Sequence, residues 1–179
     1  MKRANVLLAD PPWLFGDPLP GDKRGASSHY RCLTVAEICC FPLPPIADDA
    51  WLFLARVGSM QQEALAVVRA WGFNPPTSEI VWVKTTGDGD RLRIGMGRTV
   101  RNCHEVILVC KRGRPARLDG GVPSVIFAPR GEHSAKPDIL YETIERLADG
   151  PRVELFARVR RPGWRCFGDE LPALEATAP

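Results

Sequence analysis

The sequence predicts an α/β fold with a mostly parallel sheet and helices on both faces, in a single domain over residues 1–179. Short apolar, β-branched segments alternate with helical segments through most of the chain, which is the pattern that βαβ units produce. Gly- and Pro-rich segments separate these elements, and no repeat or linker divides the chain. The length is sufficient to bury a sizeable core.

Local signals set the bounds of these elements. Thr34 followed three residues later by Glu37 is a capping-box pattern, which predicts a short helix that the prolines after it terminate. Gly72 is a stop signal for the second helix, and Pro137 suits the first turn of the third. The predicted elements are, in order, a strand over 5–9, a loop over 14–31, a helix over 34–38, a strand over 51–54, a helix over 60–71, a strand over 79–84, an irregular segment over 85–102, strands over 105–110 and 124–127, a helix over 137–147 and a strand over 153–156.

Two polar residues lie at the carboxyl ends of predicted strands. Asp10 comes after the strand over 5–9, and Arg158 after the strand over 153–156. In an open α/β sheet, ligands bind in the crevice outside the carboxyl ends of the strands. We therefore expect a functional site at this edge of the sheet.

The composition argues against several classes of protein. No apolar run approaches the roughly 20 residues that span a bilayer, and the N-terminus does not read as a signal peptide. The six cysteines are irregularly spaced and most lie in apolar surroundings, which indicates reduced core thiols in a cytoplasmic protein. With no Cys-x-x-Cys pair and only three scattered histidines, we expect no metal dependence.

The positive charge is concentrated in one part of the chain. The net charge is +3, but residues 91–117 contain eight basic residues and one acid, so the remainder of the chain is negative. A concentrated basic segment is typical of proteins that bind a phosphate backbone. A solvated loop with a basic bias is the alternative interpretation of the same pattern.

The tetrapeptide Asp10-Pro11-Pro12-Trp13 is suited to methylation of an exocyclic amine. The lone pair of such an amine is delocalised, so an enzyme needs acceptors that hold the amino hydrogens. The Asp10 carboxylate and the Pro11 carbonyl would serve, because two prolines form a stiff turn without competing N–H groups. Trp13 would offer a flat face for stacking the base. In the alternative interpretation, Asp-Pro-Pro only turns the chain and Trp13 packs in the core.

The sequence resembles the MT-A70-like adenine methyltransferases over nearly its whole length. A single tetrapeptide would be weak evidence, but seven blocks in the family's order with compatible spacing are specific. The blocks are Asp10-Pro11-Pro12-Trp13, Trp71-Gly72-Phe73, Trp82-Val83-Lys84, Gly95-x-Gly97-Arg98, Arg101-Asn102-x-His104-Glu105, His133-Ser134-x-Lys136-Pro137 and Glu154-Leu155-Phe156-Ala157-Arg158, with Pro162-Gly163-Trp164 and Gly168 after them.

The resemblance implies a Rossmann-like methyltransferase fold with permuted motif order, in which the catalytic motif precedes the cofactor-binding segment. It also implies S-adenosylmethionine as cofactor, with Lys136 pairing with the cofactor's carboxylate. Gly95-x-Gly97 lacks a third glycine and does not follow the first strand, so it is not a dinucleotide fingerprint. The implied cofactor-binding residues are Asp10, Lys136, Glu154, Arg158, Asp169 and Glu170.

One position departs from the family's pattern. Asp169 stands where the family usually has asparagine, and a carboxylate cannot donate a hydrogen bond as an amide does. For the target nucleotide, the resemblance implies contacts on two loops that act as lids over the bound substrates. The implied substrate residues are Tyr30, Lys84, Arg98, Arg101, Asn102, His104 and Glu105, the first of them on the loop after the catalytic motif.

The leading hypothesis is a DNA adenine methyltransferase that binds nucleic acid, without a membrane partner. The same chemistry on RNA adenine is the second hypothesis, since the family acts on either polymer. A non-catalytic nucleic-acid-binding subunit of a methyltransferase complex is the third. A homodimer or a partner subunit would be compatible with each of them.

Overall fold

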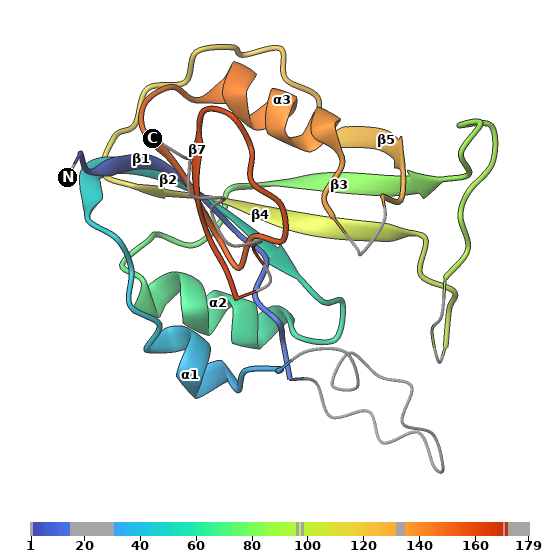
Figure 1. The fold of residues 1–179 in the computed structure, drawn as a ribbon, viewed down its shortest axis with the longest axis horizontal. Helices are drawn as coiled ribbons and strands as arrows, with labels where there is room; N and C mark the ends of the chain where they lie inside the picture. Colours follow the sequence, from blue (N-terminus) through green and yellow to red (C-terminus); the bar gives the residue numbers. More distant parts are fainter. Residues whose placement is uncertain are drawn as a thin grey trace, which may run out of the picture.

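The structure is a computed structural model that describes residues 2–14, 31–95, 97, 99–131, 135–169 and 171. Within these residues, seven strands form one sheet in the order β5-β3-β4-β2-β1-β6-β7 (Figure 1). Three helices pack against it. The elements are β1 (Ala4–Ala9), α1 (Val35–Cys39), β2 (Ile46–Arg56), α2 (Gln61–Ala70), β3 (Ser78–Thr85), β4 (His104–Arg112), β5 (Val125–Pro129), α3 (Asp138–Leu147), β6 (Arg152–Leu155) and β7 (Trp164–Phe167).

The sheet is mostly parallel, as predicted. β1 lies inside the sheet and pairs in parallel with β2 on one side and β6 on the other. Parallel pairing also joins β6 to β7 and β3 to β5. Only β4, among the strands described, runs against its neighbours, because it pairs antiparallel with both β2 and β3.

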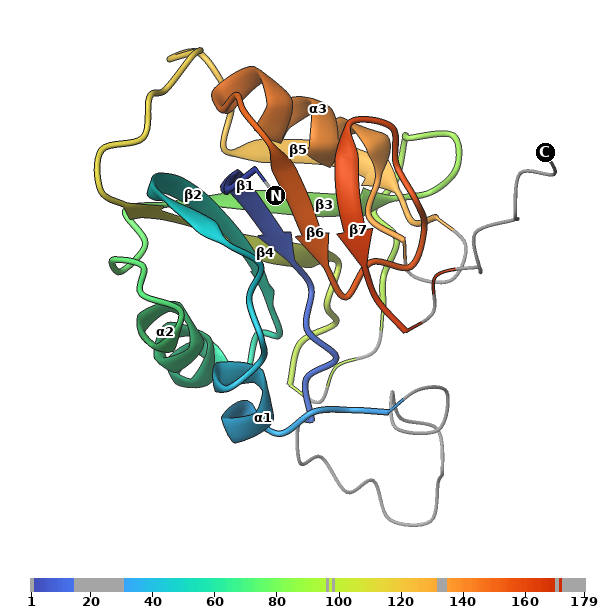
Figure 2. The same cartoon turned by 60° about the vertical axis from the view of Figure 1, so that its left-hand side comes forward.

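Helices cover both faces of the sheet, which confirms the α/β prediction (Figure 2). On one face α1 and α2 contribute Ile38, Val67 and Val68 to an apolar core. On the other face α3 contributes Leu140 and Ile144 to a second core. Each helix buries one apolar stripe against the sheet, which is how an amphipathic helix is stabilised in a protein.

The observed helices and strands agree with the predicted ones, apart from several bounds and one strand, whereas the predicted loop over 14–31 lies outside the described residues except at residues 14 and 31. The capping box is present, because the Glu37 carboxylate accepts from the Thr34 N–H at 2.8 Å and Thr34 Oγ1 accepts from the Glu37 N–H at 3.2 Å. β2 is longer than the predicted strand, beginning at Ile46. β7 was not predicted at all. No helix in the described part of the chain is long and apolar enough to cross a membrane.

Candidate functional site

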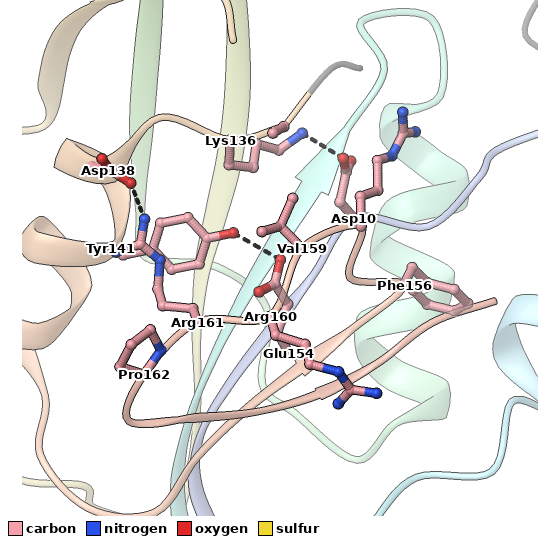
Figure 3. Close-up of a pocket in the computed structure, with 12 residues that line it drawn as sticks. Asp10, Lys136, Asp138, Tyr141, Glu154, Phe156, Val159, Arg160, Arg161 and Pro162 are labelled. Carbon is pink, nitrogen blue, oxygen red and sulfur yellow. Dashed lines mark hydrogen bonds and ion pairs between the residues drawn. The ribbon is translucent and has the colours of Figure 1, made fainter. Parts of the chain in front are cut away.

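The candidate site lies where β1 and β6 end side by side. Ala9 pairs with Leu155, the last residue of β6, so Asp10 and Phe156 leave the sheet together. A cavity of about 330 Å³ opens at this edge (Figure 3). It is lined by residues from three segments: Asp10 after β1; Ala135, Lys136, Asp138 and Tyr141 around the start of α3; and Glu154, Phe156, Arg158, Val159, Arg160, Arg161 and Pro162 in β6 and the loop after it.

The turn after Asp10 is held by backbone hydrogen bonds. The Trp13 N–H donates to the Pro11 carbonyl at 2.8 Å, and the Leu33 N–H donates to the Pro12 carbonyl at 2.8 Å. A carbonyl oxygen has two lone pairs, so Pro11 keeps one for a further donor. The two prolines add no N–H of their own to this turn. Asp10 is thus presented to the cavity on a rigid turn at the end of a buried strand.

Trp13 does not offer the exposed stacking face that the sequence suggested. Its side chain belongs to the core on the α1 and α2 side of the sheet, and the residue is only 4% exposed. The indole N–H donates to the Ala55 carbonyl at 3.1 Å. A buried tryptophan usually finds such a partner, and the bond ties the turn to the end of β2. The core interpretation of Trp13 is therefore the correct one for this structure.

Four side chains of alternating charge form a row that begins at Asp10 in the cavity and ends at Lys84 near the end of β3. Lys136 Nζ lies 2.5 Å from Asp10 Oδ2 and 2.9 Å from Glu105 Oε2. Lys84 Nζ lies 2.7 Å from Glu105 Oε1. The Lys136 side chain is only 6% exposed, so its charge depends on these two carboxylates. The row carries two positive and two negative charges, and each charge has an opposite neighbour.

Electrostatics fix the protonation of this row. Burial opposes ionisation of Glu105, but Lys136 and Lys84 outweigh burial and lower its pKa to about 2. Burial likewise opposes the charge of Lys136, but Asp10 and Glu105 raise its pKa above the ordinary value. Both groups are therefore ionised at neutral pH. In this structure the carboxylate of Glu105 binds two lysines, so its negative charge is balanced by residues of the protein.

A second polar pair forms another wall of the cavity. The Tyr141 hydroxyl donates to Glu154 Oε1 at 2.9 Å, and Glu154 is 5% exposed. Burial raises the pKa of Glu154 to about 7, and the nearby charge of Asp10 adds to that rise. Burial also raises the pKa of Tyr141. Glu154 is thus a carboxyl group that changes charge near neutral pH inside the cavity.

The loop between β6 and β7 turns sharply into the cavity. Phe156, its first residue, has φ +61°, the one positive φ among the described residues other than glycine. Its ring packs on Phe41 at 4.6 Å between centroids. A Cβ on Gly168 would overlap the backbone of Ala157, so the two ends of the loop approach closely only because residue 168 is glycine. This closure places Arg158 at the cavity.

Arg161 connects this loop to α3. Its guanidinium forms an ion pair with Asp138, the first residue of α3, and lies 3.9 Å from the centre of the Tyr141 ring. Figure 3 shows the two contacts beside the Tyr141–Glu154 bond. Sequence reasoning missed Arg161, Asp138 and Tyr141. The one available signal was that Asp138 and Tyr141 lie two and five residues after the predicted Lys136.

The structure unites some of the predicted residues and leaves others apart. Asp10, Lys136, Glu154 and Arg158 all line the cavity. Asp169 is exposed just after β7 and is not among the lining residues, so its role stays a prediction. Three further predicted residues are exposed on or beside the segment between β3 and β4: Arg101, Asn102 and His104. Tyr30, Arg98 and Glu170 lie outside the described residues.

Comparison with known proteins gives one family and two kinds of relative. The MT-A70 family model matches residues 4–170. The human N(6)-adenosine-methyltransferase catalytic subunit METTL3 is 33% identical over 97% of this chain, which covers 29% of that protein. The type II methyltransferase M.MunI of Mycoplasma is 29% identical over 96% of this chain and 79% of its own length. The chain thus spans less than a third of METTL3 but most of M.MunI.

Proposed function

The chain belongs to the MT-A70 family, and from this premise we propose that it transfers a methyl group from S-adenosylmethionine to the exocyclic amino nitrogen of adenine in a nucleic acid. The observation that carries the proposal is the position of Asp10. Its carboxylate stands at the carboxyl end of β1, a buried strand inside the sheet, and lines a cavity of about 330 Å³. Ligand sites of open α/β sheets lie at this edge.

The residues around the cavity fit the chemical groups of S-adenosylmethionine, which would supply an electrophilic methyl group on a sulfonium. Lys136 and Arg158 are cations suited to its carboxylate. Asp10 and Glu154 are acceptors suited to its ammonium group and its ribose hydroxyls. A cavity lined by both signs of charge suits a ligand that carries both.

For the amine, we assign Asp10 and the Pro11 carbonyl as acceptors. They would hold the two amino hydrogens, which favours a pyramidal nitrogen with an available lone pair. S-adenosylmethionine would supply the methyl carbon that the nitrogen lone pair attacks; its sulfur would leave as a neutral thioether with the electrons of the broken carbon–sulfur bond, and one amino proton would pass to water. No covalent bond to the protein is needed, and the cavity lining that the structure describes contains neither a cysteine nor a serine.

We favour DNA as the polymer and keep RNA as the second candidate. The chain is short and matches M.MunI over most of that protein's length, whereas it matches a minor part of METTL3. Recognition of RNA in particular would require contacts to the 2′-hydroxyl, and no sequence motif in the chain signals such contacts. The METTL3 similarity is the reason to test RNA in parallel.

The test is transfer of a labelled methyl group to DNA and RNA of matched sequence, with wild type and Asp10→Ala. Nucleoside mass spectrometry of the product identifies the polymer, the base and the modified atom together. We expect N6-methyladenine from wild type, and transfer by Asp10→Ala lower by on the order of a hundredfold or more. Equal transfer by the two proteins would refute the assignment of Asp10. Calorimetry with S-adenosylmethionine separates an enzyme from a non-catalytic subunit, which would not bind it.

A further inference from the structure

The segment between β3 and β4, residues 86–103, is called the arm here. It extends past the end of β3 at the right of Figure 1. The arm is anchored in the charged row of the candidate site, because Lys84 and Glu105 flank it and form an ion pair at 2.7 Å. Glu105 binds Lys136, and Lys136 binds Asp10. The arm is therefore linked to Asp10 through this row of ion pairs.

The backbone of the arm is folded on itself rather than loose. The Arg93 N–H donates to the Lys84 carbonyl at 2.8 Å, and the Gly95 N–H donates to the Asn102 carbonyl at 2.8 Å. A Cβ on Gly97 would overlap the Val100 carbonyl oxygen, so the chain can reverse so tightly only with glycine there. This close approach explains the Gly95-x-Gly97 pattern without a phosphate-binding loop.

The side chains of the arm combine exposed apolar groups with exposed cations. Leu92, Ile94 and Val100 are 51%, 66% and 71% exposed. Single exposed apolar residues need no explanation, but three on one short arm beside a candidate active site do. Three arginines of the arm are also exposed; its two acids, Asp88 and Asp90, lie at its start, and its described residues from 91 to 103 include none. The arginines are Arg91, Arg93 and Arg101.

We propose that the arm is a wedge for nucleic acid: its apolar side chains contact the bases that flank the target adenine, and its arginines contact the neighbouring phosphates. This inference rests on the proposed function, since the target base must leave its stack to reach the cavity. Extrusion leaves a gap in a duplex, and inserted Leu or Ile side chains fill such gaps in other DNA-binding proteins. The charge of the arm favours a polyanionic partner over a protein surface.

The wedge contributes where a base has to be extruded. In duplex DNA the enzyme has to offset unpairing and unstacking of the target, a cost of a few kcal/mol that single strands largely avoid. Apolar contacts with the flanking bases lower this cost, while the arginine contacts serve both kinds of strand. Loss of the apolar groups should therefore discriminate between duplex and single-stranded substrates, whereas loss of the arginines should not.

The experiment compares wild type with Leu92→Ser/Ile94→Ser/Val100→Ser. Leu118→Ser is the matched control, because Leu118 is 59% exposed and lies beside the carboxyl end of α3, away from the site. Binding of fluorescent duplex and single-stranded oligodeoxynucleotides is measured together with kcat/KM on each. For the triple variant we expect about a tenfold or greater loss on duplex and less than about a threefold loss on single strands. Leu118→Ser should match wild type on both.

A second variant tests the charged half of the wedge. Arg91→Gln/Arg93→Gln should weaken duplex and single-strand binding alike and reduce the slope of log affinity against log salt by about two. Equal losses on both substrates for the triple variant, or none, would overturn the wedge. Sedimentation measures the oligomeric state of each variant. A wild-type dimer that becomes a monomer in the triple variant would also overturn the wedge, because the arm would then be a protein interface.

The binding measurements keep this inference separate from the proposed function. If wild type transfers no methyl group to any nucleic acid, the proposed function fails. The wedge is still supported if the triple variant loses duplex binding but keeps single-strand binding, and it is refuted if the triple variant binds duplex as tightly as wild type does. Calorimetric binding of S-adenosylmethionine should be unchanged in the triple variant, because the three side chains do not line the cavity.

Discussion

The ammonium group of Lys136 lies 2.5 Å from Oδ2 of Asp10, across 126 residues of sequence. The lysine side chain is 6% exposed and the aspartate side chain 26%. The contact joins the segment before α3 to the end of β1, and Glu105 on β4 shares the same ammonium group. One cation thus fixes the relative positions of two carboxylates at the candidate site.

Asp10→Asn tests the chemistry of the carboxylate with little change of shape. The amide replaces one acceptor oxygen by a donor that faces the Lys136 ammonium, so we expect kcat for methyl transfer to fall by on the order of a hundredfold. Asp48→Asn is the matched control, because the Asp48 side chain is 96% exposed and remote from the cavity. Steady-state kinetics with labelled cofactor measures both. An Asp10→Asn enzyme with wild-type kcat would exclude the proposed acceptor role.

Lys136→Met removes the shared cation but keeps an unbranched side chain of similar length. Asp10 and Glu105 then lose their common partner in a partly buried place, so we expect the free energy of unfolding to fall by about 3 kcal/mol. Urea unfolding measures the change. Lys136→Met/Asp10→Asn should recover part of the loss, because Asp10 loses its ion pair in the single variant, whereas Glu105 keeps Lys84 at 2.7 Å. No loss of stability in the single variant would contradict the ion-pair row.

Glu154 predicts a specific dependence of stability on pH. Its pKa is raised from 4.5 to about 7, so the folded protein binds this proton more tightly than the unfolded chain does. The resulting stabilisation is full below pH 4.5 and is lost as the pH rises through about 7. Between pH 5 and pH 8 we expect wild type to lose on the order of 2 kcal/mol relative to Glu154→Gln, which cannot titrate there. Parallel pH profiles of the two proteins would refute this.

Trp13→Phe separates a role in the core from contact with the base. Phenylalanine keeps most of the buried apolar surface but leaves the Ala55 carbonyl without its donor, so we expect a loss of stability of about 1 kcal/mol. Because the indole is buried, kcat for methyl transfer should fall by less than about tenfold. Thermal unfolding and kinetics measure the two effects. A loss of kcat as large as that of Asp10→Ala, at unchanged stability, would instead support direct contact between Trp13 and the substrate.

Gly168→Ala tests the closure of the loop between β6 and β7. The new Cβ would overlap the backbone of Ala157, so the loop must shift and carry Arg158 with it. We expect a loss of stability of about 1–3 kcal/mol and weaker calorimetric binding of S-adenosylmethionine. Gly58→Ala is the control, because a Cβ there meets no atom within 4 Å. Equal behaviour of the two variants would show that the loop does not depend on glycine at position 168.

Most of the fold could be predicted because its elements carry local signals. The run before Asp10, the capping box at Thr34 and the proline at the start of α3 each act within a few residues of sequence. β7 lacks such a signal. Its four residues include Arg165 and Cys166 and show neither an apolar run nor an alternation, so pairing with β6 determines the strand.

Several residues of the candidate site could be predicted from the sequence, but the contacts between them could not. Asp10, Lys136 and Glu154 were named from motifs, whereas the row from Asp10 to Lys84 depends on how four segments meet in space. Trp13 follows Asp10 closely in the sequence, so that proximity favoured an exposed role. Its burial follows from the direction of the turn after β1, which sends the indole under α1 and α2. The spacing of apolar residues in the sequence does not predict the direction of that turn.

The antiparallel direction of β4 has a consequence for how this scaffold can change. A parallel strand would need a crossover returning to the opposite edge of the sheet, whereas β3 and β4 are joined at one edge. Residues 86–103 therefore start and finish between two fixed anchor points, and their length can vary without altering any strand register. Under the proposed function, exchange of this one insertion would change the sequence preference while the proposed methyl-transfer chemistry at Asp10 is retained.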